Sequence, residues 1–347
     1  MPSEEGPPTL ATVAASAGVS VATVSKVLNG RADVGPATRA RVETLLRQHD
    51  YVERRSEPTA RGSVEQPTVE LVFHGRQAGY SLEILQGVLN AATEARVAVA
   101  VSVRPRHQRS AGVERTAAWV RRLAAAGRQA VIDVVDDVRQ GDLTGLSRAR
   151  LPLVVIDPLN LPRRQVTSVG ATNFAGGLAA TEHLLALGHH RIAYLGTDVS
   201  SLYNQARLHG YRAALEAASR DVPRDYIRSG GSHYEDGMAG GAVLLDLLPR
   251  PTAVFAATDE IAAGVIEAAR LRGLRVPEHI SVVGFDDTEV ARLLSPPLTT
   301  VRQPLREMGS VALRTALRLA AGEKLDSHHV ELATELVVRS STAPQVG

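Results

Sequence analysis

The chain has 347 residues, of which 44% are hydrophobic, and a formal net charge of +2. This length exceeds the usual size of one compact domain, and the nearly balanced charge gives only a weak electrostatic indication of nucleic-acid binding. The absence of cysteine excludes a disulfide framework and a thiolate metal site, and it fits a reducing, cytoplasmic compartment. No apolar run is long enough to cross a membrane. Residues 1–8 are acidic and proline-rich, which predicts a disordered tail and not a secretion signal.

A pattern of two short helices joined by a tight turn occupies residues 9–30. Thr9 is a suitable N-cap for the first helix, and Gly18 ends that helix because glycine adopts the left-handed conformation at low cost. Ser20 then caps a second helix, which ends at Asn29-Gly30. Two helices joined by a short glycine-containing turn are typical of the helix-turn-helix motif, whose second helix enters the major groove of DNA.

The second helix presents small side chains and one lysine on the face opposite its apolar residues. Val21 and Ala22 offer methyl contacts to thymine, and Lys26 can donate to guanine or to phosphate. A third helix from about Pro36 to Gln48 closes a three-helix core, and an ordinary small helical bundle is the structural alternative. The candidate DNA-binding residues of this domain, assigned to residues 9–53, are Thr9, Ser20, Val21, Ala22, Thr23, Ser25, Lys26, Asn29 and Thr38.

The motif T-L-x-x-V-A-x-x-A-G-V-S-x-x-T-V-S-K-V-L-N-G, followed by T-R-x-R-V, resembles the headpiece of the lactose-repressor family of bacterial regulators. The resemblance continues through the core, most specifically at residues 188–192, 282–287 and 297–303. It implies a homodimer that binds a palindromic operator in double-stranded DNA. It also implies an effector-binding core of two lobes, similar to a periplasmic binding protein.

Residues 54–68 are polar and contain Pro58, Gly62 and Pro67, which predicts a linker. In the family this stretch forms a hinge helix on DNA, with a leucine wedged into the minor groove. Here the wedge position falls at or near Ala60, and alanine does not separate stacked bases as leucine does. The departure argues against minor-groove kinking and favours a flexible linker, although Ala60 stays among the candidate DNA-binding residues.

From Val69 onward, short apolar runs alternate with amphipathic segments. The runs are residues 69–73, 97–103, 130–135, 153–156, 192–195, 253–257 and 281–285, and the segments are residues 83–95, 115–126, 176–187, 207–218, 237–248 and 260–272. This alternation predicts an α/β fold with parallel sheets covered on both faces, and the number of strands predicts two lobes. Residues 69–341 are assigned to this core and residues 342–347 to a loose tail. The resemblance implies crossings between the lobes near Ser168, near residues 298–301 and near Ser327.

Polar side chains follow several of the strand-like runs, where a ligand in a cleft between lobes would meet them. Two carboxylates and the guanidinium of Arg207, which is expected to open a helix, suit the hydroxyls of a neutral polyol such as a sugar. Under the resemblance, His233 or Tyr234 occupies the place of a stacking aromatic. Asp259 is expected to cap a helix. The candidate effector-binding residues are His74, Asp157, Arg207, His233, Thr258, Asp286 and Gln303.

These features predict a cytoplasmic, dimeric transcription regulator, a repressor, that responds to a sugar or glycoside. No nucleophile elbow or phosphate-binding loop indicates an enzyme, and no metal or cofactor is expected. A solute-binding protein for a sugar transporter and an enzyme of sugar metabolism are the alternatives from other classes. Within the regulators, a purine or a partner protein is the alternative effector. Helix 83–95 and residues 292–294 are candidates for the dimer interface.

Overall fold

A computed structural model describes residues 10–28, 34–48, 66–104, 113–135, 140–159 and 166–345. The chain divides into two compact units, residues 1–64 and 65–347. The tail at residues 1–8, most of the linker, and the candidate DNA-binding residues Thr9, Asn29 and Ala60 lie outside the described residues.

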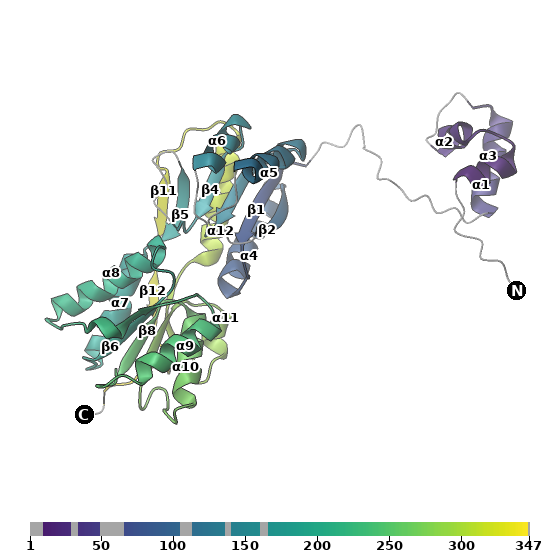
Figure 1. Ribbon diagram of the computed structural model, residues 1–347. Coiled ribbons are helices and arrows are strands. Elements are labelled where there is room, and N and C mark those ends of the chain that lie inside the picture. Colours follow the sequence, from purple (N-terminus) through teal and green to yellow (C-terminus); the bar gives the residue numbers. More distant parts are fainter. Residues whose placement is uncertain are drawn as a thin grey trace, which may run out of the picture. The chain divides into compact units, whose positions relative to one another are not determined.

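The first unit contains three helices, α1 (Leu10–Ala17), α2 (Val21–Leu28) and α3 (Pro36–Gln48), at the predicted positions (Figure 1). Gly18 has φ +64° and ends α1, and the Ser20 hydroxyl caps α2 by accepting from the Thr23 amide at 3.1 Å. A small apolar core holds the helices together, made of Val13, Ala14, Ala17, Val24, Val27 and Val42. The predicted helix-turn-helix geometry is therefore present.

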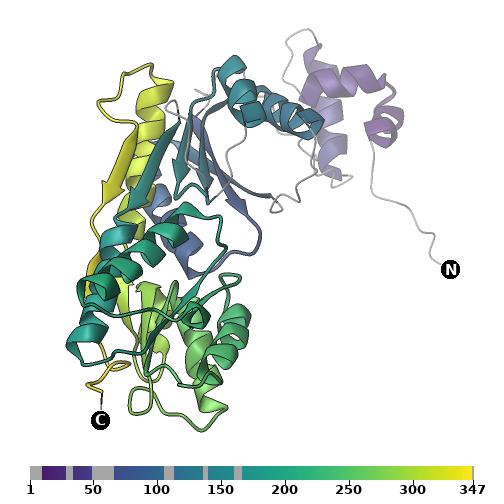
Figure 2. The same ribbon diagram turned by 60° about the vertical axis from the view of Figure 1, so that its left-hand side comes forward.

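The second unit consists of two lobes, each with a six-stranded sheet between helices (Figures 1 and 2). The sheet of the N-lobe is parallel, in the order β11-β5-β4-β3-β1-β2. Its strands are β1 (Thr68–His74), β2 (Ala98–Arg104), β3 (Arg128–Val134), β4 (Leu153–Ile156), β5 (Thr167–Ala171) and β11 (His329–Leu332). Its helices are α4 (Gly79–Ala95), α5 (Val113–Ala125), α6 (Gln140–Arg148) and α12 (Leu305–Ala320). Helices α4 and α12 cover one face, and α5 and α6 cover the other.

The sheet of the C-lobe has the order β12-β10-β9-β8-β6-β7, and β12 alone of these described strands runs antiparallel to its neighbour. Its strands are β6 (Ile192–Gly196), β7 (Ile227–Ser229), β8 (Ala253–Ala256), β9 (Ser281–Asp286), β10 (Thr299–Arg302) and β12 (Glu335–Val337). Its helices are α7 (Asn173–Ala186), α8 (Leu202–Ala217), α9 (Tyr234–Leu245), α10 (Asp259–Arg270) and α11 (Glu289–Leu293), with a 3-10 turn η1 (Arg224–Tyr226).

Each sheet reverses its strand order at one point, with β1 between β2 and β3 in one lobe and β6 between β7 and β8 in the other. Ligands of open α/β sheets bind outside the carboxyl ends of the strands next to such a reversal. The fold therefore brings two potential binding edges into one core.

The chain crosses between the lobes at Thr172, at residues 303–304 and at residues 333–334. The predicted crossings are each a few residues too early, because β5 and β10 continue to the crossing points and β11 still belongs to the N-lobe. Thr172 and Thr334 tie the first and third crossings together by hydrogen bonds of 2.9–3.2 Å.

Other predicted boundaries also need correction. Arg207 does not open a helix, since α8 begins at Leu202. The segment expected to be a loose tail is bound as far as residue 345, because the Ala343 amide donates to the Ser281 hydroxyl and the Gln345 amide donates to the Leu187 carbonyl. These contacts attach the segment to the C-lobe, which the sequence pattern did not indicate.

Helices α7 and α8 pack against each other through a glycine on each helix. A Cβ at Gly177 would overlap the Arg207 carbonyl oxygen, and a Cβ at Gly210 would overlap the Phe174 carbonyl oxygen. The two backbones therefore approach closely only because both positions lack a side chain, and this approach fixes α8 where it carries Arg207.

Asp259 is the first residue of α10 and is not its cap, contrary to the sequence prediction. The cap is Thr258, whose hydroxyl accepts from the Ile261 amide. The fully buried Asp259 carboxylate instead accepts from the Thr288 amide at 2.7 Å and from the Thr300 hydroxyl at 2.6 Å. Burial raises its pKa to about 7, against these hydrogen bonds, which lower it.

We expect Gly177→Ala to destabilise the core by about 1–3 kcal/mol, because the new methyl group forces α7 and α8 apart. Thermal unfolding of the full chain measures this loss. Gly141→Ala is the matched control, because a Cβ at this exposed position in α6 meets no atom within 4 Å. Equal melting temperatures for the two variants would contradict the proposed close packing.

We expect Asp259→Asn to change the dependence of stability on pH. A carboxyl with a raised folded-state pKa stabilises the fold while protonated, and this stability is lost as the pH rises from about 4 to about 7. Relative to the unaltered protein, the melting temperature of the variant should therefore rise between pH 5 and pH 7 and then level off.

Asp246→Asn is the control for this measurement, because Arg272 holds the pKa of Asp246 below its ordinary value. Its difference from the unaltered protein should stay constant between pH 5 and pH 8. A constant difference for Asp259→Asn as well would contradict the raised pKa.

Candidate functional site

Helix α2 carries a small exposed surface opposite the apolar core of its unit. Val21, with 45% of its surface exposed, lies there beside exposed Ala22 and Lys26. The Ser20 hydroxyl is engaged in the helix cap, with Thr23 Oγ1 at 2.9 Å. Ser25, and Thr38 in the first turn of α3, are half-buried. A helix whose outward side chains are this small fits closely into a major groove.

The core contains a cavity between its two lobes. The N-lobe lines it with residues that follow β1, β3 and β4, and the C-lobe with residues that follow β8 and β9 or begin α8 and α9. Of the predicted effector-binding residues, the cavity is lined by His74, Asp157, Arg207, His233, Thr258 and Asp286. The cavity thus lies where the two strand-order reversals face each other.

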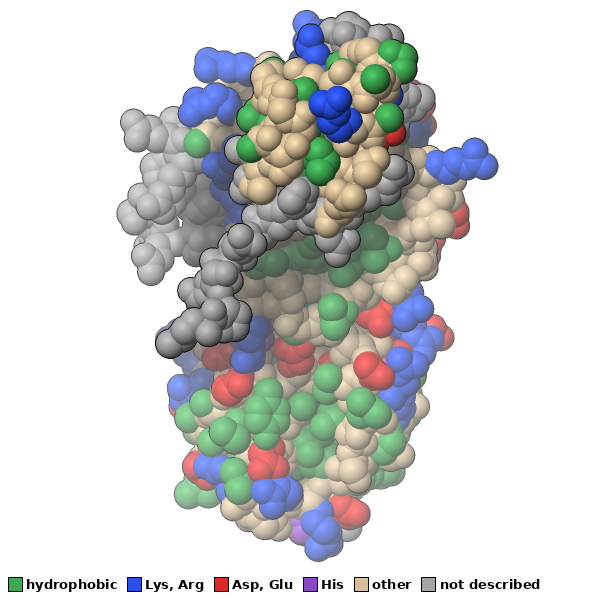
Figure 3. Space-filling model, turned by 90° about the vertical axis from the view of Figure 1, so that its right-hand side faces the viewer, with side chains coloured by type: hydrophobic (Ala, Val, Ile, Leu, Met, Phe, Trp, Pro, Cys, Tyr) green, Lys and Arg blue, Asp and Glu red, His purple; other side chains and the backbone are tan. Residues whose placement is uncertain are grey.

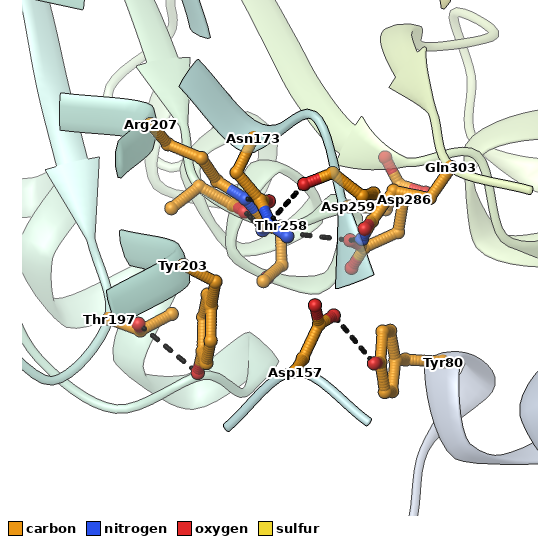
Figure 4. A network of polar contacts seen from close by, with 12 residues as sticks. Tyr80, Asp157, Asn173, Thr197, Tyr203, Arg207, Thr258, Asp259, Asp286 and Gln303 are labelled. Carbon is orange, nitrogen blue, oxygen red and sulfur yellow. Dashed lines mark hydrogen bonds and ion pairs between the residues drawn. The ribbon is translucent and has the colours of Figure 1, made fainter. Parts of the chain in front are cut away.

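Arg207 is the largest fully buried side chain of the described structure, with 2% of its surface exposed. Its Nε donates to Asn173 Oδ1 at 2.8 Å and its Nη1 donates to the Ala257 carbonyl oxygen (Figure 4). Nη1 also lies 3.6 Å from Asp286 Oδ1, and the guanidinium stacks 3.7 Å from the ring centre of Phe285. These contacts hold a positive charge in one place at the floor of the cavity.

Two carboxylates border Arg207, one from each lobe. Asp286 Oδ1 accepts from Gln303 Nε2 at 2.6 Å, and burial raises the pKa of Asp286 well above its ordinary value while Arg207 lowers it. Asp157 Oδ2 accepts from the Tyr80 hydroxyl at 2.7 Å, and burial likewise raises the pKa of Asp157 against Tyr80 and Arg207. The cleft therefore combines fixed acceptors with one fixed donor, which suits hydroxyl groups.

Three non-glycine residues that line the cavity have positive φ angles: Val135 (+55°), Asp157 (+45°) and Asp286 (+112°). Such conformations cost free energy and persist where the surroundings enforce them, most often at functional sites. Each residue follows or ends a strand of the sheets. The strained backbone conformations therefore occur at the strand ends, where the chain places these residues in the lining of the cleft.

The remaining predicted residues have other contacts. His74 Nε2 lies 2.6 Å from Asp133 Oδ1, and His233 Nδ1 lies 3.5 Å from Glu260 Oε2. Gln303 does not line the cavity; it lies at the second crossing and supports Asp286. Tyr234, the alternative stacking aromatic, also does not line it.

The cavity lining includes Phe73, which ends a predicted apolar run, and two further aromatic residues, Tyr80 and Tyr203, which the sequence pattern did not indicate. Tyr203 lies in the first turn of α8, its ring 5.1 Å from the Arg207 guanidinium carbon. Both tyrosines belong to the first turns of helices that begin earlier than predicted. An aromatic residue a few positions after the end of a strand, in the first turn of the next helix, is the sequence feature that would have identified both tyrosines.

The loop between β1 and α4 and the first residue of α4 contact the C-lobe beside the cavity. Arg76 Nη2 donates to Glu235 Oε2 at 2.9 Å, and the Gly79 amide donates to Glu260 Oε1 at 3.3 Å. Both carboxylates belong to the first turns of C-lobe helices, α9 and α10. The lobes are thus in contact around the cavity.

Among the residues that the structure describes, no group of three or more His, Cys, Asp or Glu side chains could hold a metal ion. No helix in the described ranges is both long and apolar enough to cross a membrane.

Two family models match the chain, that of bacterial regulatory proteins of the lacI family over residues 9–53 and that of a periplasmic-binding-protein-like domain over residues 181–342. The HTH-type transcriptional regulator CelR of Thermobifida fusca is 34% identical, over 96% of this chain and 98% of CelR. A solved CelR–cellobiose complex is 33% identical with a TM-score of 0.72, and covers 96% of this chain and 99% of its own. The lac repressor dimer bound to operator and the anti-inducer ONPF is 29% identical with a TM-score of 0.69, and covers 97% and 100%.

The similarity to CelR extends over nearly the whole of both chains and therefore includes the helix-turn-helix unit and the two-lobed core together. The predicted family and fold class are confirmed. This protein belongs to the LacI family of bacterial regulatory proteins and is a helix-turn-helix, DNA-binding transcriptional regulator.

Proposed function

We propose that this regulator is a repressor whose operator affinity is controlled by a small sugar-type effector bound between the lobes. The observation that carries the proposal is the buried Arg207, bordered by Asp157 and Asp286 in one cavity. A guanidinium fork and two carboxylates can engage several hydroxyls at fixed angles. The CelR–cellobiose complex supports a sugar, since that relative binds one.

We further propose that residues 9–53 bind DNA and that residues 54–68 join them to the core. Val21, Ala22 and Lys26 would meet base edges, while Ser20, Thr23, Ser25 and Thr38, with Thr9 and Asn29, would meet phosphates. A homodimer would present two such surfaces to half-sites about one helical turn apart. Exposed Leu82, Leu89 and Leu293 support a dimer interface at α4 and α11.

The effector would act through its different affinities for two arrangements of the lobes, because a ligand shifts an equilibrium only by such a difference. This function places the protein in the cytoplasm, where the operator is, and makes it a binding protein without a catalytic step. A transporter-linked solute-binding protein would have no use for a lacI-family headpiece, which argues against that alternative.

An operator sequence is first selected from random DNA duplexes with the unaltered protein. We expect Lys26→Ala to weaken binding to this operator by about tenfold or more. The loss of one donor to base or phosphate is the physical reason. Lys324→Ala removes an exposed lysine of the core and is the matched control. Electrophoretic mobility shifts measure both variants. Equal losses in the two, or none in Lys26→Ala, would count against α2 as the DNA-reading helix.

We expect Asp286→Asn to weaken effector binding at least tenfold while operator binding remains, since a hydrogen bond to a charged group contributes about 1.5–3 kcal/mol. Calorimetric titration with sugars and glycosides that bind the unaltered protein measures this. The control is Asp287→Asn, because Asp287 pairs with Arg302 and Arg339 away from the cavity lining. Asp287→Asn should lower the melting temperature and keep effector affinity.

If hypoxanthine or guanine binds and no sugar does, the sugar proposal is wrong. If both substitutions impair effector binding equally, the placement of the effector against Asp286 is wrong.

A further inference from the structure

The cavity contains more acidic than basic side chains. Its lining includes three carboxylates, Asp157, Glu260 and Asp286, and two cations, Arg76 and Arg207. Arg76 is paired outward with Glu235, which does not line the cavity. Arg207 is therefore the single inward cation of the described lining, against three carboxylates.

Arg207 is itself largely committed to the protein. Nε and Nη1 donate to Asn173 and Ala257, and Asp286 offsets the positive charge. No hydrogen bond between described residues uses Nη2. This nitrogen remains able to donate to a ligand hydroxyl, but the guanidinium offers little uncompensated charge to an anion.

Helix N-termini, the usual anion-binding elements of such sheets, are already occupied by acidic residues of the chain. The first turn of α9 contains Glu235 and Asp236, and that of α10 contains Asp259 and Glu260. Asp236 accepts from the amide of His233, the N-cap of α9, at 3.1 Å, and Glu260 accepts from the amide of Gly79, the first residue of α4, at 3.3 Å. A phosphate or carboxylate of a ligand would meet these carboxylates where it needs donors.

In the space-filling view, Asp and Glu side chains lie along the border of the hollow between the two lobes of the core, with Lys and Arg side chains beside them (Figure 3). Within the cavity, burial already disfavours the negative charges of Asp157 and Asp286, as their raised pKa values indicate. A further negative charge at this place would be repelled in a medium of low dielectric constant.

We propose that the cleft selects its effector by charge: it binds polyhydroxylated ligands that are uncharged or carry an amine, and it excludes their phosphorylated and carboxylated counterparts. This inference rests on the proposed function of the cleft as a sugar site and names the class of sugar. The carboxylates act as acceptors for hydroxyl or ammonium donors, and Glu235 and Glu260 place negative charge in the first turns of α9 and α10, where it repels anions.

The first experiment compares neutral sugars with charged derivatives of them, by calorimetry on the full-length protein. The probes are glucose, glucosamine, glucose 6-phosphate and glucuronate, and cellobiose with cellobionate. Whichever neutral sugar binds, its anionic counterpart should bind about 100-fold more weakly or worse, whereas glucosamine should bind no more weakly than glucose. Equal affinity for a neutral sugar and its anionic counterpart would overturn the proposal.

The second experiment tests charge exclusion without any sugar. The shift in melting temperature that inorganic phosphate causes in the unaltered protein, compared with chloride at equal ionic strength, is the reference. The variant Glu235→Gln/Glu260→Gln should be stabilised by phosphate more than this reference, because it removes two negative charges from the first turns of α9 and α10. Glu267→Gln, which removes a carboxylate from the side of α10 where it pairs with Arg270, should gain none.

The two experiments separate the possible failures. No gain in stabilisation by phosphate in the double variant, relative to the unaltered protein, would overturn charge exclusion. If no sugar of the panel binds but the phosphate results are as expected, charge exclusion is supported and the sugar assignment of the proposed function fails.

Discussion

The burial of one guanidinium determines the organisation of the effector cleft. Removing a charge from water costs several kcal/mol unless neighbouring groups compensate it. Around Arg207 the compensation comes from Asn173, Ala257, Phe285 and Asp286, all of which belong to the C-lobe. The C-lobe half of the site is therefore preorganised by the requirements of its own fold. The N-lobe then adds acceptors and the walls that close the cavity.

The contacts that close the cavity are of a different kind. Arg76 and Glu235 are both more than half exposed, and exposed ion pairs contribute little to stability. A preorganised half-site joined to its other half by weak contacts can change its degree of closure at low cost. A ligand that touches both lobes, through Asp157 and Asp286, would then supply much of the free energy that favours one arrangement.

The sequence predicted those parts of the site that depend on strand ends and missed those that depend on helix starts. Asp157 and Asp286 directly follow or end apolar runs, so their place at the carboxyl edge could be derived from the pattern. Tyr80 and Tyr203 were missed because hydrophobic periodicity shows the body of a helix better than its first turn.

The short strands β5, β7, β11 and β12 were missed because few apolar residues mark them. Asp259 was misassigned because the sequence does not distinguish an N-cap from a buried first-turn carboxylate that binds a neighbouring strand.

Gln303 connects the site to the segments that join the lobes. It was predicted to bind the effector, but it lies at the crossing between β10 and α12 and donates to Asp286 at 2.6 Å. Asp286 in turn has a φ angle of +112°, so its position is enforced by its surroundings and not by local preference. Any shift of this carboxylate toward a ligand must either stretch its bond to Gln303 or move the crossing segment with it. Because α12 belongs to the N-lobe, a displacement that begins at the C-lobe carboxylate reaches the N-lobe through a single hydrogen-bonded residue.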